Sequence, residues 1–397
     1  MALLTRKTQI GLKSETTEGT AVTNIGPNDA AFNLFDSVTF TPEIEQTERN
    51  AFRSTIGRRA SIAGVKTGTI SFTSELVGGG VSSSNVLKPA ISELLLPCGF
   101  AEYSVKKLSG GSITDTFLVG ETVSQPSGVS GVIRAVVKNG STYDLYLSGS
   151  SGTVNSTGSI TGATSGATMA PSGAALAANT NYVYTTATED GTLVKSATVE
   201  MIQDGVKHAI KGARGNVTFR GSTGTPLQAV FEFTGPKIDT VNHPLYTGVS
   251  YPTNTPPTLL DASFTTHAFS GVIDTVEFST NNDLQVRRDM NQPSGLISTK
   301  IVSRAMGGSI DPEMTVVTGS GSHDWFGNMD TNAEALTQIE VGNSTTPVSG
   351  NHFVLCAPNS QYTNITPGER NGIAINTIDL ACNESTIGDD DFQIVCL

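Results

Sequence analysis

The chain contains an internal duplication, and this feature constrains its fold more than any motif does. Residues 34–40 (LFDSVTF) recur as residues 272–278 (VIDTVEF), and the correspondence continues without a gap at a constant offset of 238. Between Asp36 and Glu75 there are seven identities with the matching segment; roughly two or three are expected at ordinary residue frequencies. Two copies of one β-rich unit can place two copies of one interface around an axis, which favours a ring assembly.

The composition favours a large protein of two or three domains. With 397 residues the chain exceeds one ordinary core, and it contains no apolar run long enough to span a membrane. Its beginning, MALLTRKTQIGL, lacks the apolar stretch of a secretory signal. Cys98, Cys356, Cys382 and Cys396 are widely spaced and form no CxxC pair. We expect small buried residues in a reducing compartment, with a disulfide as the less favoured alternative.

The charge balance restricts the partners. A net charge of −12 argues against a sequence-reading DNA-binding protein, which would carry a basic face. It fits either a protein at high local concentration or a surface that must not retain nucleic acid.

Strand signals dominate the chain. Apolar and polar residues alternate between Gly, Pro or Asn in segments 38–44, 68–76, 195–202, 215–221, 227–235, 274–280, 307–314, 352–357 and 373–382. The last segment mirrors 227–235 in position and pattern. Burial on one face is typical of antiparallel sandwiches and barrels, so the predicted class is mainly β.

Each half also contains one predicted helix. Leu87, Ala90, Ile91, Leu94, Leu95 and Cys98 have helical spacing, with Ser84 or Asn85 as cap and Gly99 as terminator. In the second half, Trp325, Phe326, Met329 and Ala333 follow Ser322 in the same way. We expect both helices to pack on their own sheets, with Trp325 as a core residue.

These patterns predict a domain organisation. Residues 1–110 together with 173–235 form a first β-domain, and 261–397 form a second. Residues 111–172 have no counterpart in the second half and are expected to be a small β-module inserted in a loop, on the outer surface. Residues 236–260 are rich in Pro, Thr and Asn and are expected to be an extended connector.

The search for reaction chemistry finds no enzyme signal. The five histidines form no HExxH or other metal-spaced pair, and there is no dinucleotide fingerprint, Walker loop or GxSxG. Each histidine is expected at the surface or in a turn. Asp389, Asp390 and Asp391 lack a calcium-loop pattern, so a solvated acidic tip is favoured. We expect no catalytic residue, no metal and no cofactor.

The most unusual local feature is the charged run from Pro42 to Arg59. Acidic residues come first and basic residues follow, as in a hairpin with one sign of charge on each arm. It is either a solvated loop or an arm that pairs with the next subunit, where complementary charges set the register. The matching segment 281–295 keeps Arg287, Arg288 and Asp289, which favours the arm. The candidate contacts between subunits and rings are Glu43, Glu45, Glu48, Arg49, Arg53, Arg58, Arg59, Arg287, Arg288 and Asp289.

Several of these segments resemble a known family. QIGLKSETTEGTAVT (9–23), RASIAGVKTGTISFTSEL (59–76) and HAIKGARGNVTFRGSTGTPLQAVFEFTG (208–235) are similar to the tail tube (major tail) proteins of long-tailed bacteriophages. The GETV phrase at 120–123 and TSGAT at 164–168 resemble small β-modules of phage structural proteins. The likeness covers most of residues 5–235, and the second half joins through the duplication.

The resemblance implies two tandem tail-tube-type β-sandwich or barrel domains, each with one flanking helix, whose sheets line up between subunits into an inner β-barrel. Stacked rings would conduct DNA from the capsid to the host. With two domains per chain, three chains would make a pseudo-sixfold ring; a hexamer of chains is the alternative. The implied partners are copies of itself, tail terminator and tail tip or baseplate proteins, the tape measure protein and transient double-stranded DNA. The implied location is the virion, after assembly in the host cytoplasm.

Two other functions stay open at this stage. A virion surface adhesin or receptor-binding β-sandwich would carry a sugar or metal site. A tail-associated glycan hydrolase would need a carboxylate pair on a long β-solenoid, and no short regular repeat is present.

Overall fold

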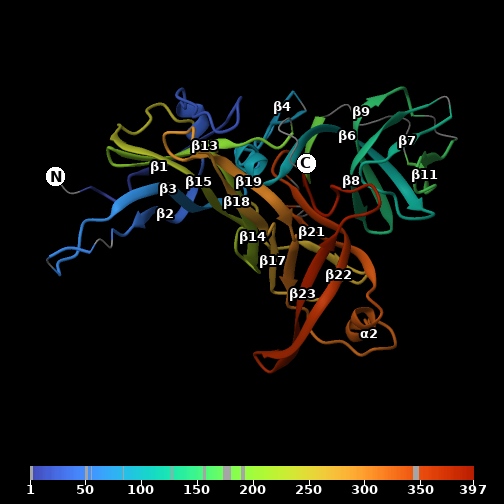
Figure 1. The fold of residues 1–397 in the computed structure, drawn as a ribbon. Coiled ribbons are helices and arrows are strands. Elements are labelled where there is room, and N and C mark those ends of the chain that lie inside the picture. Colours follow the sequence, from blue (N-terminus) through green and yellow to red (C-terminus); the bar gives the residue numbers. More distant parts are fainter. Residues whose placement is uncertain are drawn as a thin grey trace.

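The computed structural model describes residues 3–49, 52–54, 56–83, 85–126, 128–154, 158–172, 180–188, 193–342 and 348–397. Over these ranges the protein is mainly β, as the sequence predicts (Figure 1). The strands are β1 (Thr8–Ser14), β2 (Leu34–Thr47), β3 (Ile62–Glu75), β4 (Val81–Ser82), β5 (Asn85–Val86), β6 (Phe100–Ile113), β7 (Thr122–Ser124), β8 (Ser130–Asn139), β9 (Thr142–Ser151), β10 (Ile160–Gly162), β11 (Thr168–Pro171), β12 (Thr180–Thr186), β13 (Ala197–Gln203), β14 (Val206–Ser222), β15 (Gln228–Asn242), β16 (Ser263–Thr266), β17 (Thr275–Ser279), β18 (Asn282–Arg288), β19 (Leu296–Arg304), β20 (Gly307–Ile310), β21 (Glu334–Val341), β22 (Phe353–Arg370), β23 (Ile373–Asn383) and β24 (Gln393–Cys396).

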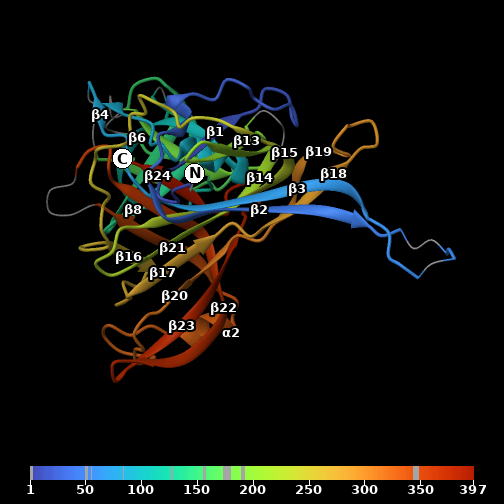
Figure 2. The ribbon, with the colours of Figure 1, turned by 90° about the vertical axis from the view of Figure 1, so that its left-hand side faces the viewer.

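One continuous antiparallel sheet runs through both halves of the chain. Its eight strands follow the order β2–β3–β15–β14–β17–β20–β23–β22. In Figure 2 this sheet extends from the long β2–β3 hairpin, which projects to the right, to the β22–β23 hairpin at the bottom. In this sheet the two halves of the chain meet at the pairing of β14 with β17. A second pairing, of β12 with β24, also joins the two halves.

One face of this sheet is packed with apolar side chains. Phe231 and Phe233 of β15 are fully buried and pack against Phe72 of β3, with ring centroids 5.6 and 6.0 Å from the Phe72 ring. The same core continues into the second half through Phe278 of β17 and Ile378 of β23. Because side chains alternate along a strand, the opposite face carries the polar residues of the same strands.

A closed barrel of six strands stands beside the sheet. Its order is β6–β9–β8–β7–β10–β11 and back to β6. Its interior is a separate apolar cluster that includes Leu108, Phe117, Ile133 and Met169. The first part of β6 pairs instead with β12, so one strand belongs to both the barrel and the main body. Within the barrel, β8 and β9 form an antiparallel hairpin.

The first predicted helix is confirmed in position but is shorter than its apolar pattern. It comprises α1 (Ser92–Leu95) and a 3-10 turn, Leu96–Cys98, and Gly99 ends it at φ 89° as expected. Leu87 lies outside it, because Pro89 intervenes and does not extend a helix from within. Of the two expected caps, Ser84 lies outside the described residues and Asn85 belongs to β5.

The second helix, α2 (Trp325–Asp330), differs from the prediction at both ends. Its cap is Asp324, whose Oδ1 accepts a hydrogen bond of 2.9 Å from the Gly327 amide, so Ser322 is not the cap. Asp324 stands directly before the first helical residue, where a short acceptor reaches the free amides best. Ala333 lies beyond the end of the helix. Trp325 is 2% exposed, which confirms it as a core residue.

The expected connector is partly strand. β15 continues to Asn242 and occupies the first seven residues assigned to the connector. The rest lies along the surface, where the Tyr246 hydroxyl donates to Glu200 (2.7 Å) and the Asn254 amide donates to the Gly78 carbonyl (2.8 Å). No helix within the described ranges is long and apolar enough to cross a bilayer.

Candidate assembly interface

The pairing registers of the two halves of the sheet follow the same pattern. Ser71 of β3 pairs with Glu232 of β15, which pairs with Asn216 of β14. In the second half, Ser309 of β20 pairs with Asp379 of β23, which pairs with Asn364 of β22. Ser309 stands 238 residues after Ser71, the offset found in the sequence. The segments NVTFRGS (216–222) and NITPGER (364–370) therefore take equivalent places in β14 and β22.

The junction between the halves is a short antiparallel ladder that buries large side chains. Phe219 of β14 lies opposite Phe278 of β17, and they are 1% and 0% exposed. Thr218 lies opposite Ser279, with their hydroxyl oxygens 3.0 Å apart. The Thr280 amide donates to the Val217 carbonyl at 3.1 Å and extends the ladder by one pair.

The side-chain amide of Asn216, which is partly buried, fixes the end of this junction. The Asn216 Oδ1 accepts from the Asn282 amide (2.6 Å) and the Thr280 hydroxyl (3.0 Å), and its Nδ2 donates to the Asn282 carbonyl (3.2 Å). Asn282 in turn donates through Nδ2 to the carbonyls of Cys98 and Gly215, both at 2.9 Å. These bonds fix the register of β17 on β14.

Among the strands that the structure describes, the two outermost of the sheet, β2 and the last part of β22, each have one edge without a partner strand. Within the described part of the chain, β2 pairs with β3 alone, and residues 362–370 of β22 pair with β23 alone. Thr39, Thr41, Thr366 and Glu369 are exposed on these edges. A cleft of about 960 Å³ lies beside the start of β2 and is lined in part by Leu34, Asp36 and Val38. A long unpaired edge is a template for another strand.

The predicted charged run forms a projecting hairpin, as expected. β2 and β3 carry it beyond the sheet (Figure 2), with Glu43 and Glu45 on the outgoing arm. Near its tip Arg58 forms an ion pair with Glu48. Arg49 and Arg53 are exposed there, and Arg59 is partly so.

The second charged segment lies on the β18–β19 hairpin and faces the first half of the same chain. Arg288 forms an ion pair with Glu45 of the arm, and its hydrogen bonds hold the pKa of that carboxyl below its usual value. Arg287 pairs with Glu18 at 3.0 Å. Asp289 stabilises its own turn by accepting from the Asn291 amide at 2.9 Å. All ten candidate residues are exposed or partly exposed. The contacts of Arg287, Arg288 and Asp289 described above are made within one chain.

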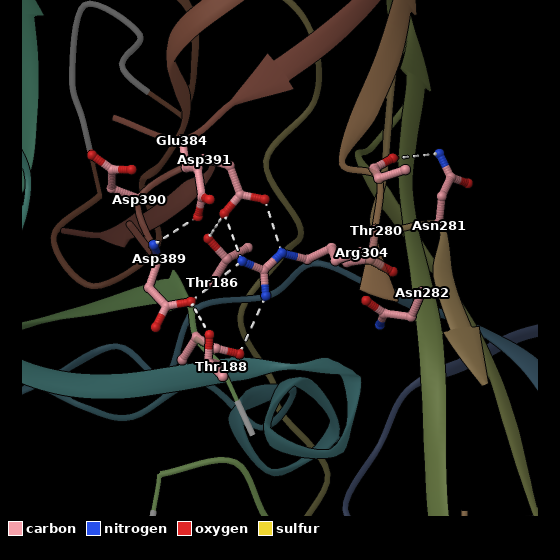
Figure 3. A network of polar contacts seen from close by, with 12 residues as sticks. Thr186, Thr188, Thr280, Asn281, Asn282, Arg304, Glu384, Asp389, Asp390 and Asp391 are labelled. Atoms are coloured by element: carbon pink, nitrogen blue, oxygen red, sulfur yellow. Dashed lines mark hydrogen bonds and ion pairs between the residues drawn. The ribbon is translucent and has the colours of Figure 1, made fainter. Parts of the chain in front are cut away.

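The acidic tip predicted at residues 389–391 is wrong for two of its three carboxylates. Asp390 and Asp391 are 1% and 6% exposed. In Figure 3 the Arg304 guanidinium points at Asp391, with Nε 2.8 Å from Oδ2 and Nη2 3.0 Å from Oδ1. Thr186 of β12 also donates to Asp391, and burial raises the pKa of Asp390. This network attaches the end of β19 to the C-terminal segment and to β12.

Of the histidines expected at the surface or in turns, His352 is instead buried, whereas His267 lies in a turn and both His267 and His323 are partly exposed. His352 is 9% exposed and its Nε2 lies 2.8 Å from Glu340. The rings of His323 and Trp325 are 4.3 Å apart, and His267 stacks on Tyr362 at 4.2 Å. Burial lowers the pKa of both His267 and His323.

The described residues contain no candidate metal site. No cluster of three or more His, Cys, Asp or Glu side chains in those ranges could hold a metal ion. The four cysteines are buried and free, as predicted, and burial raises the pKa of each thiol, which disfavours the reactive thiolate.

Comparison with known proteins leaves the function open. No protein-family model matches the chain, and no curated protein matches its sequence.

Proposed function

We propose that this protein is the structural subunit of a phage tail tube, in which the β22 edge of one copy pairs with the β2 edge of the next. Three copies would close a ring with a continuous inner sheet, and stacked rings would form a channel for DNA. The subunit would act in the virion, after assembly in the host cytoplasm, without catalysis or cofactor.

The observation that carries the proposal is the β14–β17 junction. The strand sets β2–β3–β15–β14 and β17–β20–β23–β22 share one order and one register, which supports reading them as two tandem domains. β17 then corresponds to β2, and β14 corresponds to β22. Within one chain, the edge of β14 is already paired with the edge of β17. The equivalent edges, those of β22 and β2, are unpaired among the described strands and would pair between two copies.

The internal junction predicts the register of the intermolecular one. Thr218 opposite Ser279 becomes Thr366 opposite Thr41 of the next copy, and Asn364 takes the place of Asn216. The Thr223 amide donates to the Asp274 carbonyl beside the internal junction, at 2.9 Å. The equivalent position is Asp36, which lines the cleft beside β2, so this cleft is the expected seat for the β22–β23 turn of the neighbour.

The charge on the polar face suits a DNA conduit. Glu232 of β15, Glu277 of β17 and Asp379 of β23 are exposed there, with Arg220 of β14 as the nearby cation. In a ring this face would line the channel. Each cation that contacts a phosphate adds affinity through counterion release, so an acidic lining lets DNA slide.

The remaining parts are assigned on the same basis. The closed barrel would be the inserted module and would lie on the outside of the tube, because none of its strands pairs with β2 or with residues 362–370 of β22. The charged arm would contact the adjacent ring. Terminator, tip and tape measure proteins would meet the ends and the bore of the tube.

Negative-stain microscopy of the purified protein at high concentration tests the proposal. Rings or tubes of uniform bore, with three copies per ring, are expected. A dispersed monomer at every concentration would contradict it, and affinity for glycans in such a monomer would favour the adhesin instead.

A further inference from the structure

The two free edges of the sheet each contain a proline that the internal junction lacks. Pro42 of β2 is equivalent to Thr280, and Pro367 of β22 is equivalent to Phe219. Both prolines are exposed. We infer that Pro42 and Pro367 weaken the pairing of one copy with the next, so that copies associate only when concentrated or templated. This inference rests on the proposed function.

The argument depends on which way the missing N–H groups would point. In an antiparallel ladder, hydrogen-bonded and non-hydrogen-bonded pairs alternate. The Thr280 amide donates across the junction to the Val217 carbonyl, and the Val217 amide donates to the Thr280 hydroxyl at 3.1 Å. Both N–H groups of this pair therefore point across the ladder, as in a pair of the hydrogen-bonded kind. Two residues along β14, Phe219 belongs to the same kind and its amide also faces β17.

Proline has no N–H to donate. At the intermolecular junction Pro42 would lie opposite Ile365, and Pro367 would lie opposite Phe40. In each of these pairs only the residue opposite the proline has an N–H to donate. In the equivalent internal pairs, Val217 with Thr280 and Phe219 with Phe278, both residues have one. The next pair, Glu369 with Val38, keeps both donors.

The same geometry explains why the prolines do not disturb the subunit. A proline is tolerated in a sheet where its nitrogen faces the open side of an edge strand. Pro42 pairs with Gly68 of β3 and Pro367 pairs with Asn376 of β23. The Asn376 amide donates to the Pro312 carbonyl and not to β22, so the Pro367 nitrogen is expected on the open side of its strand. Pro42 takes the place of Thr280, whose amide faces the junction, so its nitrogen is expected on the open side as well. Free edges that carry prolines resist indiscriminate pairing.

The test restores the donors. P42T copies the internal residue Thr280, and P367T supplies a β-forming residue with an N–H at the second site. Sedimentation velocity over a concentration series measures the association of the wild type, each single variant and the double variant. P171T makes the same exchange in the last residue of β11, a strand of the closed barrel, and serves as the control.

Each restored hydrogen bond is expected to tighten association by roughly fivefold, so the double variant should assemble at a concentration more than tenfold lower. P171T should match the wild type. If the wild type assembles at high concentration and the double variant needs the same concentration, the inference fails while the proposed edge pairing stands. If no variant associates at any concentration, both fail.

Discussion

Thr218 and Ser279 lie directly opposite each other across the junction of the two halves of the sheet, with their hydroxyl oxygens 3.0 Å apart. They belong to strands whose counterparts, β22 and β2, form the free edges. The chain therefore displays, within itself, the contact that we expect it to make with a second copy.

The two equivalent asparagines should respond differently to the same substitution. Asn216→Ala removes three hydrogen bonds at the internal junction and leaves the Asn282 amide without that partner. We expect it to lower the free energy of unfolding by about 1–3 kcal/mol. Asn364→Ala, at an exposed edge, should change it by less than about 0.5 kcal/mol in the isolated subunit but should reduce assembly. Urea unfolding at low protein concentration measures the first effect; equal losses for both variants would refute the distinction.

Removal of Arg304 should be among the most destabilising single changes. Its guanidinium is paired with the nearly buried Asp391, so Arg304→Met leaves that carboxylate without its cation. We expect a loss of about 3–5 kcal/mol in the free energy of unfolding. Lysine cannot reproduce the two-point geometry, so Arg304→Lys should fall between Met and wild type. The control Arg288→Met removes an exposed ion pair and should leave thermal unfolding unchanged. A wild-type melting curve for Arg304→Met would contradict the assigned role.

Acid should weaken the packing around Trp325, the single tryptophan of the chain. Burial holds the pKa of His267 and His323 below the ordinary value of about 6.5. The neutral rings therefore stabilise the fold fully when the pH is above the ordinary pKa. This stabilisation is lost as the pH falls from the ordinary pKa through the lowered pKa of the folded protein. Because the His323 ring lies 4.3 Å from the indole, Trp325 fluorescence should report this transition. His323→Gln should reduce the change; an unaltered titration in that variant would assign the effect elsewhere.

The projecting arm should affect the stacking of rings and not the fold. Arg58→Glu with Arg59→Glu reverses charge near its tip, where Arg58 is exposed and pairs with Glu48. Circular dichroism should be unchanged, while tubes seen by microscopy should be shorter. Lys106→Glu with Lys195→Glu makes an equal change at exposed positions away from the arm and should leave tube length unaltered. Wild-type tube length in the arm variant would remove the arm from the interface.

The strands were predictable because one-sided burial leaves a period of two in the sequence. The segment 373–382 shows this best, since Ile378 and Leu380 face the core while Asp379 between them is exposed. The burial of Trp325 also followed from local pattern, as did the end at Gly99 of the 3-10 turn after α1. The pairing of β14 with β17 did not, because a pairing between distant strands has no local signal.

The prediction of a solvated acidic tip at residues 389–391 failed because of an ion pair between residues far apart in the sequence. Asp389, Asp390 and Asp391 are adjacent acidic residues, which locally favours a solvated turn. Arg304, 87 residues before Asp391, makes burial of that carboxylate possible, and no local pattern links the two. The sequence also did not predict that the six-stranded barrel closes. Its closure depends on the pairing of β11 with β6, and a pairing between strands distant in the sequence has no local pattern.

Cysteine cross-linking at the two free edges tests the central claim most directly. Thr41→Cys with Thr366→Cys places one thiol on each edge, in the register that Ser279 and Thr218 define, and the four native cysteines are buried. Thr218→Cys with Ser279→Cys is the internal control for the geometry, and Thr41→Cys with Thr363→Cys is the control out of register. We predict that oxidation of the assembled protein gives a ladder that ends at a covalent trimer, while the out-of-register pair stays monomeric. A chain that remains monomeric although the internal control forms its disulfide would contradict the account.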